Sequence, residues 1–286
     1  MITILIDWIS ATDLNPKYDK SSSHSALHDG NWSEAKGKNG YNLAQKHITG
    51  LVEYQNLKRE DMGKHIVISG KTLQKIKDNY MLTEIDLLQY HISEGHSITR
   101  LDCAIDFKGY GLTVEEFVRA FESGNVTTKL RTATVIHSLT GAGDTLYIGS
   151  MKKRKNLVRV YDKAKELGVD GDWIRVELQI MGKKATTTGK LITRTENLES
   201  DILGIIKSVC DFKTVAVWDL LMNDQLQVKM QSEPKKLGDT EKWLIKQVIP
   251  ALSRTIVLNV GFWAQFTMAL QAELPENYNH ADGEVF

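Results

Sequence analysis

Five strand-like stretches fall between residues 97 and 182, and together they restrict the chain to folds built on a sheet. They cover residues 97–109, 129–140, 144–150, 155–163 and 172–182. Strands that follow one another at such short intervals pair most readily in antiparallel order. Helical stretches come before and after this region, so the sequence predicts the α+β class. The expected architecture is a curved, largely antiparallel sheet with helices on one face.

The remaining part of residues 1–231 supplies further elements. Strands are predicted at 2–12, 49–56 and 64–70, and helices at 71–80, 82–96, 112–124 and 197–212. Thr83 and Thr113 are the expected N-caps of two of these helices, which end at Gly95 and Gly124. Residues 13–41 are polar and predict a long loop, 42–48 predict a short helix, and 212–221 fit either type of element.

The composition changes after Gln231. The segment QSEPKKLGD is typical of a linker, and helical stretches follow at about 240–256 and 260–273. We therefore expect two domains. Residues 1–231 would carry the chemistry, and residues 232–286 would form a small helical appendage.

Charge is distributed unevenly along a chain whose net charge is zero. Neutrality argues against a protein that coats nucleic acid indiscriminately. Residues 129–166, however, hold nine Lys and Arg against three acids, including the run Lys152, Lys153, Arg154 and Lys155. A local basic zone in a neutral protein suits a confined phosphate contact, while a solvated loop between two strands is the alternative interpretation.

Cysteine content and hydropathy indicate the compartment. Cys103 and Cys210 are the two cysteines of the chain, which favours a reducing setting and excludes cysteine-based zinc modules. No stretch approaches the roughly 20 apolar residues of a membrane span. The opening MITILIDWIS also lacks the pattern of a signal peptide. The expectation is a cytoplasmic protein with no membrane partner.

Three of the predicted strands carry a charged face opposite an apolar one. Because alternate side chains of a strand share a face, the charged faces hold Arg100, Asp102 and Asp106, then Arg159, Tyr161 and Lys163, then Arg175, Glu177 and Gln179. Solvated sheets also show this alternation. Here, however, arginine accompanies a carboxylate in two strands, and the third strand places a tyrosine between two cations.

These residue types suit chemistry on a phosphodiester. Carboxylates that converge on one sheet face, here Asp102, Asp106 and Glu177, can hold Mg²⁺ or Mn²⁺. A tyrosine hydroxyl is a weak nucleophile at its ordinary pKa of about 10. Arg159 and Lys163 would favour the phenolate form of Tyr161. The structural alternative is a half-buried strand tyrosine among ordinary cross-strand ion pairs, and spacing alone favours that alternative.

The ordered set DTLYIGS, KNLVRVYDKAKE and WIRVELQ resembles the replication initiation factor family, also called Rep_trans. Its members are rolling-circle initiators of plasmids and phages, with related relaxases. The upstream stretches TRLDCAID, ILIDWIS, GKNGYNLA and GKHIVISG resemble the family in order and spacing, so the likeness covers about residues 1–225. No histidine pair flanks a single hydrophobe, which fits a family that does not use that metal motif.

The resemblance implies a role for each candidate residue. Tyr161 would be the nicking nucleophile, assisted by Lys163, and would form a 5′-phosphotyrosine and a free 3′ hydroxyl before a later rejoining step. Asp102, Asp106 and Glu177 would be metal ligands, with Glu177 and one Asp the safer pair. Arg159, Arg175 and Arg100 would contact phosphate, as would the run at residues 152–155. The implied partners are origin DNA, single-stranded or as a stem-loop, and a host helicase and DNA polymerase.

Several alternatives stay open. The protein could be a relaxase of a mobile element, or an origin-binding regulator that has lost cleavage. A homodimer is possible, and the motifs do not separate plasmid from phage members. His24 and His28 are expected to be exposed loop histidines, and His65 a structural one.

Overall fold

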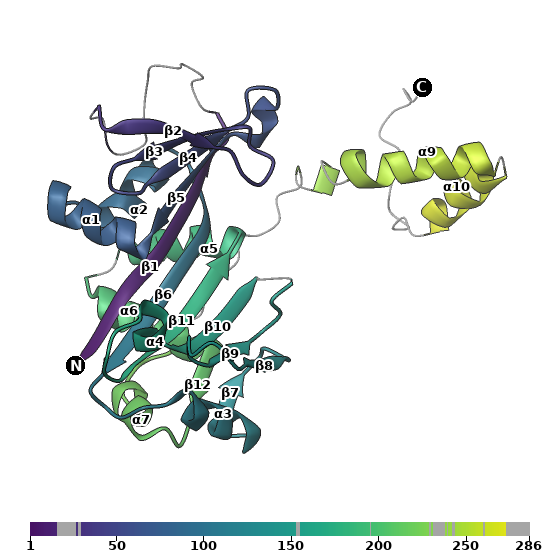
Figure 1. The fold of residues 1–286 in the computed structure, drawn as a ribbon. Helices are drawn as coiled ribbons and strands as arrows, with labels where there is room; N and C mark the ends of the chain where they lie inside the picture. The colour runs from purple at the N-terminus through teal and green to yellow at the C-terminus, as the bar shows by residue number, and fades with distance from the viewer. Residues whose placement is uncertain are drawn as a thin grey trace. The chain divides into compact units, whose positions relative to one another are not determined.

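The computed structural model describes residues 1–15, 27, 30–152, 155–194, 196–228, 230, 238, 240–241, 244–259 and 261–272. The chain divides into two compact units, Met1–Glu233 and Pro234–Phe286. Figure 1 labels the helices and strands of both. Each unit is described by itself.

The first unit is built on a sheet that has ten strands within the described residues, and every neighbouring pair is antiparallel. The strand order is β2-β3-β4-β5-β1-β6-β11-β10-β9-β8. The strands are β1 (Ile2–Asp13), β2 (Trp32–Lys36), β3 (Leu43–His47), β4 (Val52–Gln55), β5 (Lys64–Ser69), β6 (Ser97–Lys108), β8 (Ala133–Ile136), β9 (Thr145–Ile148), β10 (Asn156–Asp162) and β11 (Trp173–Met181). A second small sheet pairs β7 (Val126–Thr128) with β12 (Cys210–Phe212).

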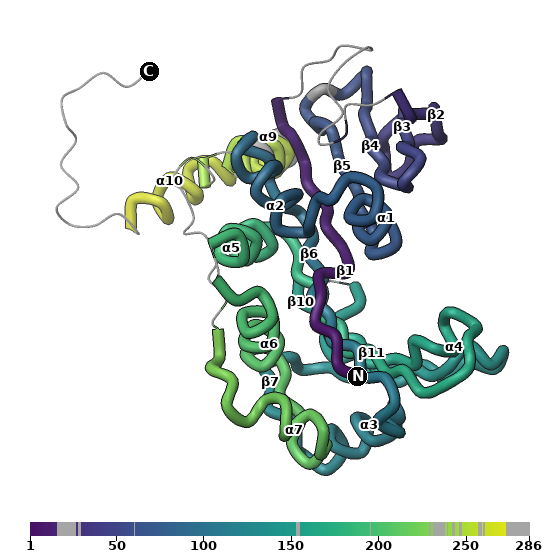
Figure 2. The backbone as a smooth tube through the Cα atoms, turned by 90° about the vertical axis from the view of Figure 1, so that its left-hand side faces the viewer, coloured from purple at the N-terminus to yellow at the C-terminus, as the bar shows by residue number. Residues whose placement is uncertain are grey.

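Helices cover one face of the large sheet, and Figure 2 shows α2, α5 and α6 on the same side of β1 and β6. The helices of this unit are α1 (Gly70–Tyr80), α2 (Glu84–Ser93), α3 (Val114–Glu122), α4 (Lys163–Leu167), α5 (Lys183–Ile192), α6 (Leu198–Val209) and α7 (Ala216–Met222), with a 3₁₀ turn η1 (Glu60–Met62). The second unit contains the π-helical turn η2 (Leu244–Val248) and helices α9 (Ile249–Leu258) and α10 (Phe262–Ala272). None of the helices in the described part of the chain has the length and hydropathy of a membrane span.

The hydrophobic core lies between the large sheet and its helices. Ile9, Ile68 and Val176 project from three strands, and Ile76 and Ile206 from two helices, and all five side chains are fully buried in one cluster. Burial of such a side chain stabilises the fold by about 1.5–3 kcal/mol. The opposite face of the sheet, here called the site face, is therefore left to the polar residues of the same strands.

The predicted class and most predicted elements are confirmed, including both helix caps. The Thr83 hydroxyl accepts a hydrogen bond from the amide of Asp86, and the Thr113 amide donates to the carboxylate of Glu116. Such caps satisfy amide groups that have no partner in the first helical turn. The ambiguous stretch at 212–221 contains helix α7.

Two predictions in the N-terminal third are wrong. Residues 42–48 contain strand β3 instead of a short helix, and the expected loop at 13–41 contains strand β2. Both strands pair antiparallel, β2 with β3 and β3 with β4, and these pairings across the sheet override the weak local preference of their sequences. Strand β7 and helices α4 and α5 were not predicted. His24 and His28 lie outside the described residues.

A buried histidine in α2 predicts loss of stability in acid. His91 is fully buried, its Nδ1 lies 3.0 Å from Nδ1 of His96, and burial, followed by the neighbouring His96, lowers its pKa to about 3. The unfolded chain binds a proton below about pH 6.5 and the folded chain does not, so stability falls as pH drops below that value. Between pH 7 and pH 5 the expected loss is about 2 kcal/mol, or roughly 4–8 °C in Tm.

Thermal unfolding at the two pH values measures this effect. The fall in Tm should be smaller in His91→Gln than in the wild type by that amount. His137→Gln is the control, because the His137 side chain is exposed beside Asp144. Equal falls in the wild type and in His91→Gln would contradict the assignment.

Candidate active site

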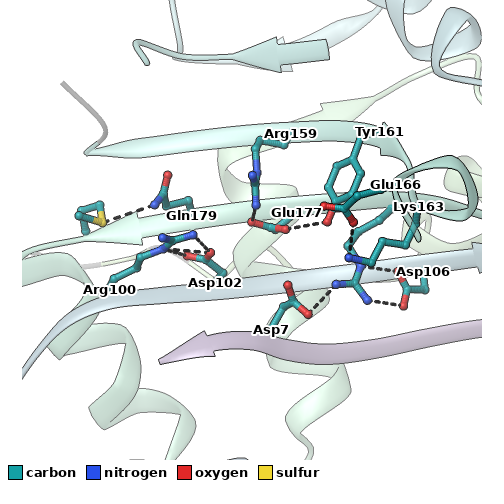
Figure 3. Close-up of polar contacts among 12 residues, drawn as sticks. Asp7, Arg100, Asp102, Asp106, Arg159, Tyr161, Lys163, Glu166, Glu177 and Gln179 are labelled. Atoms are coloured by element: carbon teal, nitrogen blue, oxygen red, sulfur yellow. Dashed lines mark hydrogen bonds and ion pairs between the residues drawn. The ribbon is translucent and has the colours of Figure 1, made fainter. Parts of the chain in front are cut away.

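The register of the sheet lines up the charged faces of β6, β11 and β10. Tyr161 in β10 lies opposite Arg175 in β11, and Arg175 lies opposite Asp106 in β6. Glu177 in turn lies opposite Arg159. The sharing of one face by these side chains, predicted from alternation alone, is confirmed, and Figure 3 shows them converging from the three strands.

Glu177 stands at the centre of this cluster. The Tyr161 hydroxyl donates to its Oε2 at 3.1 Å, and Nη2 of Arg159 donates to its Oε1. The carboxylate is fully buried. Burial alone would raise its pKa, but the charge and hydrogen bond of Arg159 outweigh burial and lower the pKa. Glu177 is therefore an ionised acceptor in contact with the tyrosine hydroxyl.

Asp102 lies beside Glu177 and is held by Arg100 from its own strand. The Arg100 Nε lies 2.9 and 3.1 Å from the two carboxylate oxygens. Burial raises the pKa of Asp102 to about 7, with the Arg100 hydrogen bond opposing the shift and the negative charge of Glu177 adding to it. The two neighbouring carboxyl groups therefore have pKa values shifted in opposite directions, upward for Asp102 and downward for Glu177.

Asp106 belongs to a different group of contacts. Its two oxygens accept from Arg175 at 2.6 and 2.7 Å, and Nη1 of Arg175 lies 2.5 Å from Oδ1 of Asp7. Arg175 is 4% exposed and is thus held between two acids under the surface.

Of the three predicted metal ligands, the structure brings Asp102 and Glu177 together and places Asp106 with Arg175. Within the described residues, no three His, Cys, Asp or Glu side chains form a group that could hold a metal ion.

Asp7 is a member of the cluster that sequence reasoning missed. The pairing of β1 with β6 shifts between Ile6, opposite Cys103, and Trp8, opposite Asp102. Thr3 lies opposite Asp106, so alternation from Thr3 already puts Asp7 on the site face, and the bulge keeps Trp8 on that face as well. Asp7 then fills the space beside the first residue of α1, where a Cβ added to Gly70 would lie 2.3 Å from Oδ1 of Asp7. An acid within the apolar run ILIDWIS was the available signal.

Tyr161 is held as a neutral phenol. Its side chain is 7% exposed, and the charged ends of Arg159 and Lys163 each lie 5.5 Å from the ring centre. Burial raises its pKa above the ordinary value, and the negative charge of Glu177 adds to the shift, which outweighs the opposing effect of Arg175 and Arg159. The expectation that the neighbouring cations favour the phenolate is wrong for this reason.

A small pocket borders the tyrosine ring. It has a volume of about 90 Å³ and is lined by Ala142, Thr145, Tyr147, Arg159, Tyr161, Asp162 and Glu166. Lys163 does not continue the strand, because β10 ends at Asp162 and Lys163 is the first residue of α4, where it pairs with Glu166. Tyr147, half-buried opposite Arg159 in β9, was not predicted as a site residue.

Around the pair Asp102 and Glu177, the nearest cations form an outer layer and the two acids an inner one. The side chains of Arg159, Arg100 and Lys163 are 30%, 22% and 14% exposed, whereas those of Asp102 and Glu177 are 1% and 0% exposed. An anion that approaches the site face therefore meets guanidinium and ammonium groups before it meets carboxylates. The exposed cations suit contact with a phosphate group.

The two described lysines of the basic run lie away from this cluster. Lys152 and Lys155 are exposed in the turn between β9 and β10, and Lys153 and Arg154 lie outside the described residues. Lys155 is six residues before Tyr161, which is about 20 Å along an extended strand. These lysines are thus placed at the far end of β10, where Met181 donates to the carbonyl of Lys155 and lies opposite Arg100.

The fold and the cluster together define a sheet-based protein with a tyrosine, paired carboxylates and cations on one face. The model of the replication initiation factor family matches residues 96–269, more than half of the chain. The chain belongs to this family. The match runs past residue 225, where the motif resemblance ended, and enters the second unit.

Two known proteins are similar to the chain. It is 24% identical over 225 residues to a putative DNA relaxase, NicK, of Bacillus subtilis (strain 168), and the matched part is 68% of this chain and 64% of that protein. The chain thus spans less than two thirds of the length of this relative. A solved structure of a rolling circle replication initiator protein from Geobacillus stearothermophilus matches 81% of this chain and 100% of that one, with a TM-score of 0.64 at 21% identity. This likeness shows the fold.

Proposed function

We propose that the protein is a rolling-circle replication initiator that nicks one DNA strand at an origin and later rejoins it, with Tyr161 as the nucleophile. The observation that carries the proposal is the hydrogen bond of the Tyr161 hydroxyl to Glu177 at 3.1 Å, beneath an outer layer of cations. A nucleophile, a proton acceptor and groups that attract phosphate then lie within one cluster, as phosphoryl transfer requires.

The proposed step balances as a transesterification. The Tyr161 oxygen bonds to phosphorus, its proton passes to Glu177, the bond between phosphorus and the 3′ oxygen breaks, and that oxygen takes a proton from water. The products are a 5′-phosphotyrosine and a free 3′ hydroxyl. Because the phosphotyrosine bond is itself a phosphodiester, attack by a 3′ hydroxyl reverses the step and joins the strand. The same site then acts as nickase and ligase.

A divalent metal, Mg²⁺ or Mn²⁺, is part of the proposal. Asp102 and Glu177 would hold it, since they offer hard oxygen ligands and lie side by side, buried, on the site face (Figure 3). When bound, such an ion polarises a phosphoryl oxygen and neutralises developing charge. Asp106 supports the site through Arg175, which it holds with two hydrogen bonds.

The cations divide by position. Arg159, Arg100 and Lys163 would contact the phosphates nearest the cleaved bond, because they form the outer layer around Asp102 and Glu177. Lys152 and Lys155, with the basic run to which they belong, would contact the DNA backbone farther along. Arg175 would orient the acids from below, since it is buried between Asp7 and Asp106.

The biological context is proposed on the likenesses alone. Origin DNA, single-stranded or as a stem-loop, would be the substrate in the cytoplasm, with a host helicase and DNA polymerase acting after the nick, for a plasmid or a phage. The similarity to a putative DNA relaxase favours one second candidate, a relaxase of a mobile element. It would use the same chemistry on a transfer origin.

Covalent capture of DNA tests the proposal without knowledge of the origin. The protein is incubated with a library of single-stranded oligonucleotides of random sequence in Mn²⁺ or in EDTA, and adducts that survive SDS are digested and sequenced. We expect adducts in Mn²⁺ with DNA linked through its 5′ phosphate, a preferred sequence at the break, and none in EDTA. Equal adduct in EDTA would contradict the metal assignment. No adduct in Mn²⁺, together with sequence-specific binding, would support a regulator that does not cleave.

A further inference from the structure

A group of aromatic side chains continues the site face beyond the charged cluster. This aromatic patch consists of Trp8 in β1, Tyr54 in β4, His65 in β5 and Tyr41 before β3. Trp8 lies opposite Asp102, so it shares the face of the candidate active site. The register then carries the same face across β5 to β4, because His65 lies opposite Tyr54.

The rings of the patch are held in place by contacts with one another and by a hydrogen bond to His65. The centres of Tyr41 and His65 lie 6.0 Å apart with planes 15° from parallel, and Tyr54 lies 6.1 and 6.4 Å from them. His65 Nδ1 is bonded to the Thr12 hydroxyl at 2.9 Å. Burial lowers the pKa of His65, which keeps the ring neutral. Fixed neutral rings offer stacking area at little cost in conformational entropy.

Arg100 connects the patch to the charged cluster. Its guanidinium carbon lies 4.3 Å from the centre of the Trp8 ring while the same guanidinium binds Asp102. The Trp8 Nε1 donates to the Ser10 hydroxyl at 2.7 Å, which fixes the ring. A guanidinium plane supported by an aromatic ring is a surface on which nucleobases stack.

Core packing does not account for these rings. The core lies on the opposite face of the same strands, where Ile9 of β1 and Ile66 and Ile68 of β5 are fully buried. The four rings are all half-buried, so each keeps part of its surface open. Half-open aromatic rings on a sheet face beside phosphate-attracting cations match the composition of surfaces that bind single strands.

We propose that the aromatic patch stacks the unpaired bases of the DNA strand whose backbone crosses the charged cluster. The inference rests on the proposed function and adds the form of substrate recognised: single-stranded, with its bases directed to the protein. Three strand spacings of about 4.8 Å separate β10 from β1, and five separate β10 from β4. The patch thus begins about 14 Å, and ends about 24 Å, from the strand that carries Tyr161. Bases several nucleotides from the cleaved bond would occupy it.

Binding of a 16-residue oligothymidine, compared with an abasic oligomer of equal length, tests the inference. Each of Trp8→Leu and Tyr54→Leu should weaken binding of the oligothymidine by about 5- to 100-fold and leave binding of the abasic oligomer unchanged, since one stacked base is lost in each case. Trp32→Leu is the matched control, because its ring packs on His47 on the helix-covered face. It should change neither affinity.

The outcomes separate this inference from the proposed function. Equal losses of affinity for both oligomers, or no loss for either, would overturn the stacking role of the aromatic patch. The proposed nicking activity would be unaffected, because covalent capture tests it separately. Loss confined to the oligothymidine in a protein that forms no adduct would support the patch and remove the nickase. Should Trp8→Leu fail to fold by circular dichroism, Tyr54→Leu decides alone, since Tyr54 lies in a short strand and has no contact with Asp102 or Glu177 among those described.

Discussion

Replacing Tyr161 with phenylalanine should abolish covalent capture of DNA and lower the nicking rate by at least about 10³-fold, the order found when a nucleophile is removed from an enzyme. The substitution keeps the ring beneath Arg159 and Lys163 and removes the hydroxyl alone. Glu177 loses one hydrogen bond from its buried carboxylate, which costs about 1–3 kcal/mol of stability. Affinity for the captured sequence should stay within a few-fold, because the cations of the outer layer are unchanged.

Tyr147→Phe is the matched control for this experiment. Tyr147 lines the same pocket, so its substitution tests whether loss of any nearby hydroxyl stops the reaction. We expect a nicking rate within a few-fold of the wild type. Normal nicking by Tyr161→Phe on a supercoiled plasmid carrying the captured sequence would exclude Tyr161 as the nucleophile. Loss of nicking in both variants would indicate that the reaction needs the intact pocket and would not single out the Tyr161 oxygen.

Replacing Glu177 with glutamine should lower the nicking rate by about 10²- to 10⁴-fold, the usual contribution of a positioned proton acceptor. Glutamine keeps the volume of the side chain and removes its charge. The phenol of Tyr161, whose pKa is raised, then has no ionised group to take its proton. The affinity for single-stranded DNA should stay the same or rise, because the substitution removes one negative charge from a surface that attracts phosphate.

The pH profile of the nicking rate separates this role from a structural one. In the wild type the rate should fall on the acid side as Asp102, whose pKa is raised to about 7, gains a proton, and in Glu177→Gln this limb should move to lower pH, because the charge of Glu177 contributes to that raised pKa. Glu115→Gln, an exposed acid in α3, is the control and should leave rate and profile unchanged. An unchanged acid limb in Glu177→Gln would assign proton acceptance to another group.

Sequence patterns predicted the strands of the site because each pattern is local. Alternation in LVRVYDK and WIRVELQ predicted which side chains share a face. The structure puts Arg159 and Tyr161 of β10 on one face with Arg175 and Glu177 of β11, and the pattern stops where β10 ends, at Asp162. The short strands β2 and β3 were missed because LAQKH and WSEAK have no strong strand preference. Their conformation is set by pairing with neighbours in the sheet, and propensity over five residues is too weak to show it.

The sequence by itself determined that the chain has a sheet with one charged face and that Tyr161, Glu177 and Asp102 lie on it, because side-chain alternation depends on one strand at a time. Only the tertiary structure decided which acids meet. Strand register pairs Asp106 with Arg175 and brings Asp7 of β1 to the same guanidinium. It also decided that Tyr161 is a neutral phenol, because burial depends on everything packed around the ring, and neighbours in sequence do not reveal it.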